Sequence, residues 1–199
     1  MSDTSRAAPP IAGVALPQPR KSGGKPLFDA LSERRSSREF RPDGLDARTL
    51  SELLWAAFGV NREHGFRTAP SAHDWREIDI YLALPDALYV YDPGAHALAP
   101  VIAQDLRAAT GLQDFVATAP LNLVYVADFA RVDSQDRAEQ RFYAAADAGL
   151  IAQNVYLFCA SEGLATVVRG LIDRPTLAMA MRLRPEQRVI LAQTVGRPV

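Results

Sequence analysis

The stretch RFYAAADAGLIAQNVYLFCAS at residues 141–161 decides the fold class, because it lies in the longest helical pattern of the chain, Arg137 to Ser161. Apolar residues leave this helix little polar surface beyond its first turns, and Gly163 is placed to end it. A helix that is apolar on nearly all sides belongs inside a large core or at an interface between subunits. We therefore expect one long central helix, with the rest of the chain packed around it.

The segments on both sides of this helix alternate apolar runs with turn residues, which is typical of strands in a sheet. Strands are expected over 78–84, 88–91, 97–101, 121–127, 164–168 and 189–195. Asp92-Pro93-Gly94 predicts a hairpin between the second and third of them. The run 121–127 is apolar almost throughout, which predicts a central strand buried on both faces.

Further helices complete an α+β domain with a mixed sheet around a buried central helix. Asp46 and Asp173 are placed as N-caps of two of them, and Gly59 is placed to end the first. The segment 61–76 has no period and is expected to be a loop, of a length that is uncommon unless it binds something. Helices are expected over 27–34, 45–58, 104–110 and 173–183.

Length and charge limit the possible classes of protein. The 199 residues predict a single domain, here 27–199, preceded by an extended N-terminal arm over 1–26 that is rich in Pro and Gly. The 22 Lys and Arg nearly balance the 23 Asp and Glu, which argues against a nucleic-acid partner. No apolar stretch reaches the ~20 residues of a membrane helix, and residues 1–26 lack a secretory layout. We expect a cytoplasmic protein of the bacterial type that needs no membrane.

Metal and thiol chemistry are not expected. His64, His73 and His96 are scattered and lack the spacing of ligands on a helix. The motifs GxGxxG, P-loop, HExxH and GxSxG do not occur. Cys159 is the single cysteine, so there is no internal disulfide, and its apolar neighbours favour a buried, inert thiol.

Three segments carry the signals for a binding site. RRSSR at 34–38 places three arginines and two hydroxyls together, and arginine forks bind phosphate oxygens in bidentate geometry. TAPSAHDW at 68–75 lies in the long loop, and GLATVVRG at 163–170 ends a strand on a glycine that permits close approach to a flat ligand. Each segment also has an ordinary structural interpretation: solvated cations at a helix end, a turn, and a strand terminus.

In their order and spacing these segments resemble the nitroreductase family of flavin mononucleotide (FMN) enzymes. The resemblance is closest to the subgroup that includes the SagB-type peptide dehydrogenases, and it runs from Pro26 to Pro198. It implies a three-layer α+β fold with a mixed, mostly antiparallel sheet flanked by helices, a long buried central helix, and a homodimer. It rests on five motifs in order: RRSSREF at 34–40, APSA at 69–72, DAG and QN at 147–149 and 153–154, GL and RG at 163–164 and 169–170, and QTVGRP at 193–198.

The resemblance also implies two FMN sites at the subunit interface of the homodimer. Arg34 and Ser36 are implied at the phosphate, together with Arg35 of the same segment and Arg197, and Arg38 toward the ribityl chain and the N1/O2 edge of the ring. The other subunit is implied to contribute Pro70, Ser71 and Asp74. The implied lining of the ring is Val168, Arg169 and Gly170, with Gln113 near the pyrimidine edge.

The activity implied by the resemblance is NADH- or NADPH-driven, two-electron reduction of nitro compounds, quinones or similar small-molecule acceptors. The flavin carries the chemistry, so no side chain is named as a catalytic acid or base. The family loop usually has Asn where this chain has Asp74, and a carboxylate there opposes flavin reduction unless Arg76 or Arg62 pairs with it. Two alternatives stay open: a SagB-type dehydrogenase of peptide heterocycles that works with partner proteins, and a flavin-binding module without turnover.

Overall fold

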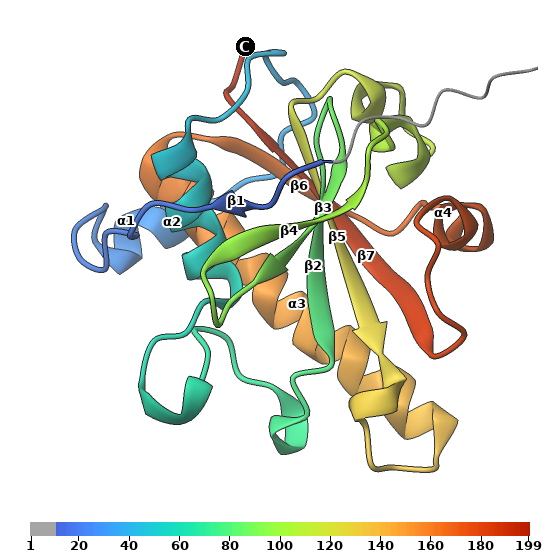
Figure 1. The fold of residues 1–199 in the computed structure, drawn as a ribbon. Coiled ribbons are helices and arrows are strands. Elements are labelled where there is room, and N and C mark those ends of the chain that lie inside the picture. The colour runs from blue at the N-terminus through green and yellow to red at the C-terminus, as the bar shows by residue number, and fades with distance from the viewer. Residues whose placement is uncertain (1–10) are drawn as a thin grey trace, which may run out of the picture.

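Seven strands form one sheet in the order β1-β4-β3-β2-β5-β7-β6 (Figure 1). The structure is a computed structural model that describes residues 11–199, so residues 1–10 of the expected arm lie outside it. Every pairing between the described strands is antiparallel, which confirms the mostly antiparallel sheet but provides no parallel pair of the kind that a mixed sheet contains. The strands are β1 (Val14–Ala15), β2 (Ile78–Ala83), β3 (Leu88–Asp92), β4 (Ala97–Ile102), β5 (Leu121–Asp128), β6 (Ala165–Arg169) and β7 (Gln187–Gly196).

The helices begin and end largely where capping residues predict. Asp46 accepts from the amide of Thr49, Asp173 accepts from the amide of Thr176, and Gly163 ends the long helix with a φ of 71°. Two expectations were too long: 104–110 forms only a 3₁₀ turn, η3 (Arg107–Thr110), and the helix after Asp173 stops at Ala180. The helices are α1 (Leu27–Glu33), α2 (Ala47–Phe58), α3 (Arg137–Glu162) and α4 (Arg174–Ala180).

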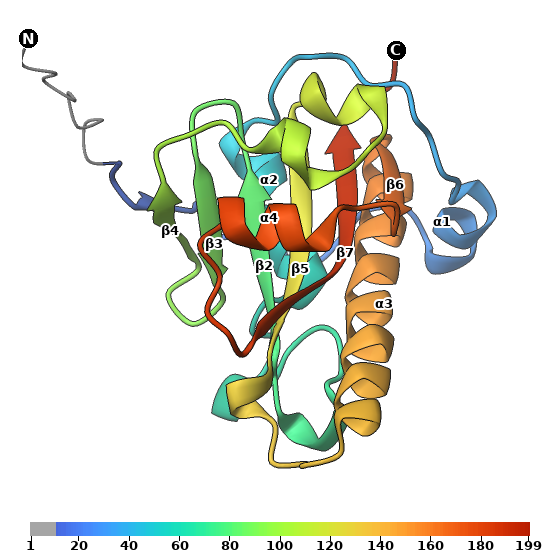
Figure 2. The same ribbon diagram turned by 90° about the vertical axis from the view of Figure 1, so that its right-hand side faces the viewer.

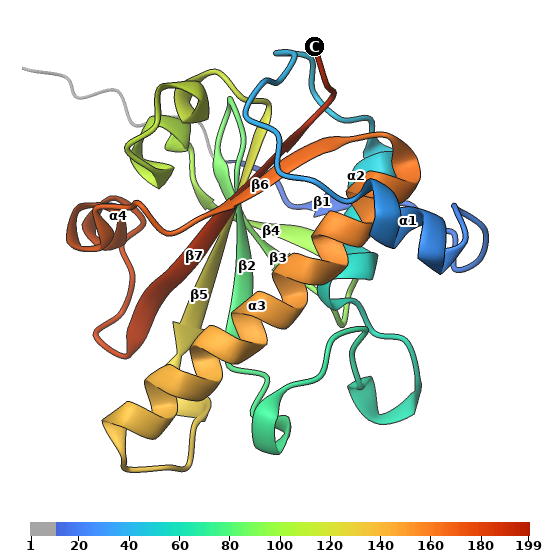
Figure 3. The same ribbon diagram turned by 180° about the vertical axis from the view of Figure 1, so that it is seen from behind.

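Helices cover both faces of the sheet, so the architecture has three layers. Helices α2 and α3 lie on one face, with α1 packed on α3 (Figure 3), while α4 and η3 cover the other face (Figure 2). Strand β5 is buried along its whole length. Leu123 and Tyr125 face the core under α2 and α3, whereas Val124 and Val126 face the core under α4. This alternation follows from the two-residue period of a strand and confirms the predicted central position of β5.

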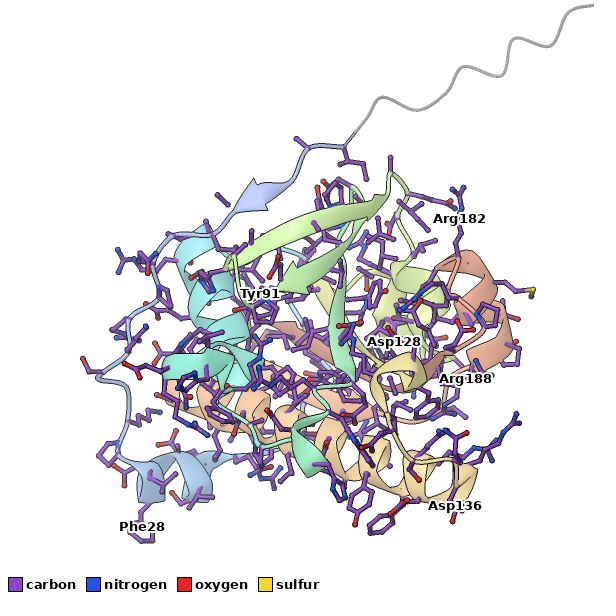
Figure 4. All side chains as sticks on the ribbon, turned by 60° about the horizontal axis from the view of Figure 1, so that its bottom comes forward. Phe28, Tyr91, Asp128, Asp136, Arg182 and Arg188 are labelled. Atoms are coloured by element: carbon purple, nitrogen blue, oxygen red, sulfur yellow. The ribbon has the colours of Figure 1, made fainter. Side chains whose placement is uncertain are left out.

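Helix α3 is buried on one side only within a single chain. Ile151, Val155 and Cys159 lie in the core, but Phe142 and Leu150 keep 67% and 44% of their surface exposed. Phe28 of α1 is 83% exposed and projects away from the molecule (Figure 4). The apolar side chains of α3 therefore divide into two groups: one is buried in the core, and the other lies on an exposed outer face.

Candidate functional site

The arginine-rich segment lies along the outer edge of β6. The amide of Ser37 donates to the carbonyl oxygen of Thr166 at 2.9 Å, and the amide of Arg41 donates to the carbonyl oxygen of Arg197 at 2.9 Å. These two bonds hold an extended backbone beside the last strands of the sheet. The predicted basic segment and the predicted strand–glycine segment, far apart in sequence, are therefore brought together.

Tyr156 of α3 connects the two segments. Its hydroxyl lies 2.8 Å from Oγ of Ser36 and accepts a hydrogen bond of 3.0 Å from the amide of Val168. The guanidinium of Arg34 lies over the ring of Tyr156, 5.2 Å from its centroid. In the sequence, Tyr156 stands out only as one more apolar residue of the helix. The missed signal is the phenol itself, because a buried tyrosine hydroxyl usually requires a hydrogen-bond partner.

The cations of this segment are available to a ligand. Among residues 11–199, neither Arg34 nor Arg35 nor Arg38 forms an ion pair with a carboxylate, and Arg35 and Arg38 are exposed. Arg197, by contrast, pairs with Asp46 at 3.3 Å on the surface. Arg34, Arg35 and Arg38 therefore form a concentrated positive charge. An anion that binds there does not have to displace a carboxylate of the protein.

A cavity of about 120 Å³ lies under this segment. Arg35, Ser37, Tyr156 and Cys159 contribute to its walls. Cys159 is buried, as predicted, and burial raises the pKa of its thiol, which keeps it protonated and unreactive.

Arg169 turns its side chain into the protein rather than toward solvent. It is 4% exposed, and its guanidinium donates only to neutral oxygens. Burial lowers its pKa to about 10, so the group still carries its charge at neutral pH. Its acceptors are the carbonyl oxygen and Oγ1 of Thr110, Oδ1 of Asn122 and Oγ1 of Thr194, at 2.8, 3.3, 3.0 and 3.1 Å.

The neighbours of Arg169 leave the backbone of the strand end accessible. Val168 packs toward the α3 face and remains half-buried, and Gly170 is exposed. A Cβ placed on Gly170 would meet only Leu191, at 3.9 Å. Of the three residues expected to line a flat ligand, Val168 and Gly170 are therefore accessible, while the Arg169 side chain lies beneath.

Gln113 lies in the same corner and has an unsatisfied acceptor. Its Oε1 is buried without a hydrogen-bond partner in the described part of the chain. A Cβ on Gly111 would lie 2.6 Å from that atom and 2.0 Å from Nη1 of Arg169, so both polar groups pack against one glycine. A buried acceptor of this kind calls for an N–H donor from elsewhere, such as a ligand.

The loop 70–76 contacts α3 at a different point. The amide of Ala72 donates to Asp147 at 2.9 Å, and Asp147 precedes Tyr156 by nine residues along α3, about 13 Å at the rise of an α-helix. Pro70, Ser71 and Asp74 therefore lie apart from the segment 34–38 and from the end of β6 in one chain. The structure does not unite the two halves of the predicted site within a single subunit.

Asp74 is paired with Arg76, one of the two arginines expected as its partner. Nε and Nη2 of Arg76 donate to its two carboxylate oxygens at 2.7 and 2.6 Å. This hydrogen bonding lowers the pKa of Asp74, so the carboxylate is ionised and paired. Arg62, the other option, bonds instead to Asn61 and to the carbonyl oxygen of Arg67.

Other site types find no support in the part of the chain that the structure describes. No group of three or more His, Cys, Asp or Glu side chains there is arranged to hold a metal ion. None of the described helices combines the length and the apolar character needed to cross a membrane.

Comparison with known proteins places the chain in a family. The model of the nitroreductase family matches residues 31–197. A protein of Methanocaldococcus jannaschii that is provisionally named as a nitroreductase is 32% identical over 183 residues, which cover 87% of this chain and 91% of that one. A crystal structure from Ralstonia eutropha JMP134, also provisionally named as a nitroreductase, is 48% identical with a TM-score of 0.90, over 94% of this chain and 90% of that one.

The fold extends to more distant proteins as well. The NADPH:FMN oxidoreductase of Vibrio harveyi, solved in complex with NAD⁺, is 21% identical with a TM-score of 0.65, over 86% of this chain and 68% of that one. The chain has the three-layer oxidoreductase fold that these comparisons share. It belongs to the nitroreductase family, and it is an oxidoreductase.

Proposed function

We propose that this oxidoreductase binds FMN and uses NADH or NADPH to reduce nitro compounds, quinones or similar small acceptors by two electrons. The observation that carries the proposal is the joining of Arg34, Ser36 and Val168 through Tyr156. It places arginines without carboxylate partners beside an accessible strand end. This arrangement suits a ligand with a phosphate at one end and a flat ring at the other.

The residues present fit FMN at three points. Arg34, Arg35 and Ser36 are assigned to the phosphate, with Arg197 at the rim, and Arg38 to the ribityl chain and the N1/O2 edge of the ring. The orphaned Oε1 of Gln113 is assigned to an N–H on the pyrimidine edge. The bound cofactor supplies hydride acceptance and donation, while the protein supplies binding, orientation and charge.

The strand end has one amide for the ring. The amide of Val168 is already bonded to Tyr156, so it is not a donor to the cofactor. Because amides of alternate residues point to the same edge of a strand, we assign the ring contact to the amide of Gly170. The fixed charge of Arg169 beneath this position favours negative charge on the ring above it.

The second half of the site is assigned to a second copy of the chain. Pro70, Ser71 and Asp74 of the partner subunit would face the cofactor held by the segment 34–38. Support comes from the separation of these halves along α3 and from the exposed apolar face of α3 and α1. Obligate dimers commonly bury more than ~2,000 Å² of core-like surface. A homodimer would cover that face and complete both sites.

Asp74 bears on the choice between an enzyme and a flavin-binding module without turnover. An unpaired carboxylate near the ring would oppose its reduction. The bidentate pairing with Arg76 compensates that charge and so favours turnover.

The test is the colour and reactivity of the purified protein. We expect a yellow protein with one FMN per subunit that is bleached anaerobically by NADH or NADPH. A colourless protein that fails to quench FMN fluorescence at micromolar concentration contradicts the proposal. A yellow protein that is inert to both nicotinamides instead favours the SagB-type dehydrogenase or the flavin-binding module without turnover.

A further inference from the structure

Two acidic side chains that the proposed chemistry does not use are buried against each other beneath the loop 70–76. Glu77 directly precedes β2 and is 1% exposed, and Asp147 lies in α3 and is 3% exposed. Together they hold two consecutive residues of the loop. Oγ of Ser71 donates to Oε2 of Glu77 at 3.2 Å, and the amide of Ala72 donates to Oδ2 of Asp147 at 2.9 Å.

Within the described part of the chain, no cation balances these carboxyl groups. Neither Glu77 nor Asp147 takes part in any ion pair among residues 11–199. The neighbouring arginines are already engaged, Arg76 by Asp74 and Arg131 by Asp79 and Asp128. The groups that act on the Glu77 side chain are its own backbone amide and the Ser71 hydroxyl, which favour the charged form, and the Asp147 carboxyl from α3, which opposes it.

The remaining oxygen of Glu77 shows where a proton belongs. Oε1 is buried and has no hydrogen-bond donor within the described chain. Two carboxylates that face each other away from water cannot both ionise. One of them therefore keeps a proton and donates an O–H hydrogen bond to the other. Burial, together with the charge of Asp147, raises the pKa of Glu77 to about 7. A proton on Oε1 would turn this unsatisfied acceptor into a donor.

The loop that rests on this pair is strained. His73, Asp74 and Arg76 have left-handed φ values of 51°, 54° and 51°, although none of them is glycine. Each such residue costs on the order of 1 kcal/mol and persists only when surrounding contacts enforce it. On the side of the loop that faces the core, Ser71 contacts Glu77 and Ala72 contacts Asp147. On the outer side, Nε1 of Trp75 donates to Asp133 at 2.7 Å.

We propose that Glu77 and Asp147 are positioning residues that hold one proton between their carboxyl groups, and that this proton fixes the loop 70–76 in its strained conformation. Loss of the proton leaves two negative charges facing each other beneath Ser71 and Ala72, and the loop is released. For its effect on cofactor affinity this inference rests on the proposed function, because Pro70, Ser71 and Asp74 are candidate FMN contacts. Its effect on the loop itself does not.

The test is hydrogen exchange of the loop backbone in the full chain. Exchange over 70–77 is followed by mass spectrometry, with and without added FMN, from about pH 5.5 to about pH 8.5, and is corrected for chemical exchange with an unstructured peptide. Protection in the wild type is expected to fall by up to about tenfold for each pH unit as the pH rises toward the pKa of Glu77 of about 7, and to level off above it. Infrared spectroscopy at low pH should show the band of a protonated carboxylic acid.

Three variants separate the proton from mere packing. Glu77→Gln keeps a donor and an acceptor without charge, so we expect loop protection that no longer depends on pH and loss of the carboxylic-acid band. Asp147→Asn removes the facing charge but leaves Glu77 buried, so the carboxylic-acid band and the loss of loop protection should both move to lower pH without disappearing. Asp133→Ala removes the acceptor for Nε1 of Trp75 and serves as the control: protection drops at every pH, but the pH dependence stays.

Two results overturn the inference. The first is wild-type protection that, after correction for chemical exchange, does not change with pH. The second is a Glu77→Gln protein whose protection keeps the pH dependence of the wild type. The wild-type measurement decides even if a variant fails to fold. Since exchange without FMN does not require the proposed function, the two can fail separately. A pH-released loop with no FMN binding contradicts only the function, and FMN binding with a pH-independent loop contradicts only the inference.

Discussion

The hydroxyl oxygen of Tyr156 lies 2.8 Å from Oγ of Ser36, which ties the arginine-rich segment to a helix of the core. Both atoms of this contact belong to the protein, so the contact orders the candidate phosphate-binding residues. Ordering them beforehand reduces the entropy that a ligand must overcome on binding. Tyr156 is therefore expected to govern cofactor affinity although it is not an assigned FMN contact.

Replacing Tyr156→Phe should weaken FMN binding about 5- to 30-fold, the equivalent of roughly 1–2 kcal/mol. The variant loses the bonds to Ser36 and to the amide of Val168 but keeps the ring that packs under Arg34. Fluorescence titration of FMN measures the effect. Tyr89→Phe is the matched control, because it also loses one tyrosine hydrogen bond, to Asp86, on a remote strand. Equal affinities in the two variants would speak against a role for Tyr156.

Arg34→Ala and Arg38→Ala should separate affinity from redox potential. Loss of a phosphate contact at Arg34 should weaken FMN binding by roughly 1.5–3 kcal/mol, or ~10- to 150-fold, and leave the potential nearly unchanged. Loss of Arg38 removes positive charge from the ring edge, so the flavin potential should fall by roughly 20–60 mV, about 1–3 kcal/mol for two electrons.

The measurements for this pair are FMN titration and potentiometry. Arg182→Ala is the control for simple loss of surface charge, because Arg182 lies beyond α4, on the opposite face of the sheet from α3 (Figure 4). Should both variants shift affinity and potential in the same proportion, the division of roles is wrong.

Gly111→Ala should destabilise the protein by about 1–3 kcal/mol. The new Cβ would lie 2.0 Å from Nη1 of Arg169 and 2.6 Å from Oε1 of Gln113, so both side chains must move. Urea unfolding measures the change. A Cβ on Gly44 meets nothing within 4 Å, and Gly44→Ala should stay within about 0.5 kcal/mol of the wild type. Two variants of equal stability would mean that the corner around Arg169 is loosely packed.

Leu150→Glu should yield a monomer that no longer binds FMN. Leu150 is exposed on α3, and a charge there would be buried without a partner in the proposed dimer. Sedimentation and FMN titration at matched concentrations test this. Met179→Glu places the same charge on α4, on the other side of the sheet, and should leave assembly and binding intact. A Leu150→Glu protein that remains a dimer refutes the assignment of this face.

Stability should fall as the pH rises from 4.5 to about 7, the range between the ordinary pKa of a glutamate and the raised pKa of Glu77. In this range the folded protein binds more protons than the unfolded chain, so each increase in pH favours unfolding. The contribution of Glu77 is on the order of 3 kcal/mol and is complete above pH ~7. Urea unfolding of the wild type and of Glu77→Gln should differ in slope over this range only, and parallel curves would contradict the prediction.

Elements whose signals are local could be predicted from the sequence. Asp46, Asp173 and Gly163 each mark a helix end through bonds to residues a few positions away, and those ends are where we expected them. The η3 turn was overestimated as a helix, because its length depends on packing under α4 rather than on its own residues. Likewise, the apolar pattern of α3 indicates that the helix is buried. It does not indicate which of its residues pack in the core of the same chain and which remain exposed on its outer face.

The candidate site was predictable in its residues but not in its connections. Arg34 and Ser36 stand out by composition, whereas their link to Tyr156 joins positions about 120 residues apart. The inward turn of Arg169 could have been expected from strand alternation, since Ala165 and Val167 share its side of the strand. The pairing of Glu77 with Asp147 has no local signal, because an acidic residue in sequence reads as exposed.

The bond from Ser37 to Thr166 also occupies a backbone acceptor on the outer edge of the sheet. The outermost strand of a sheet offers unpaired backbone groups to any other molecule, and β6, with the sequence ATVVR, has the β-branched residues that promote such strand addition. At the opposite margin the sheet ends in β1, which is only two residues long. We therefore expect a second role for the arginine-bearing segment: while it lies in place, it covers the longer margin of the sheet and disfavours addition of a strand from a neighbouring molecule.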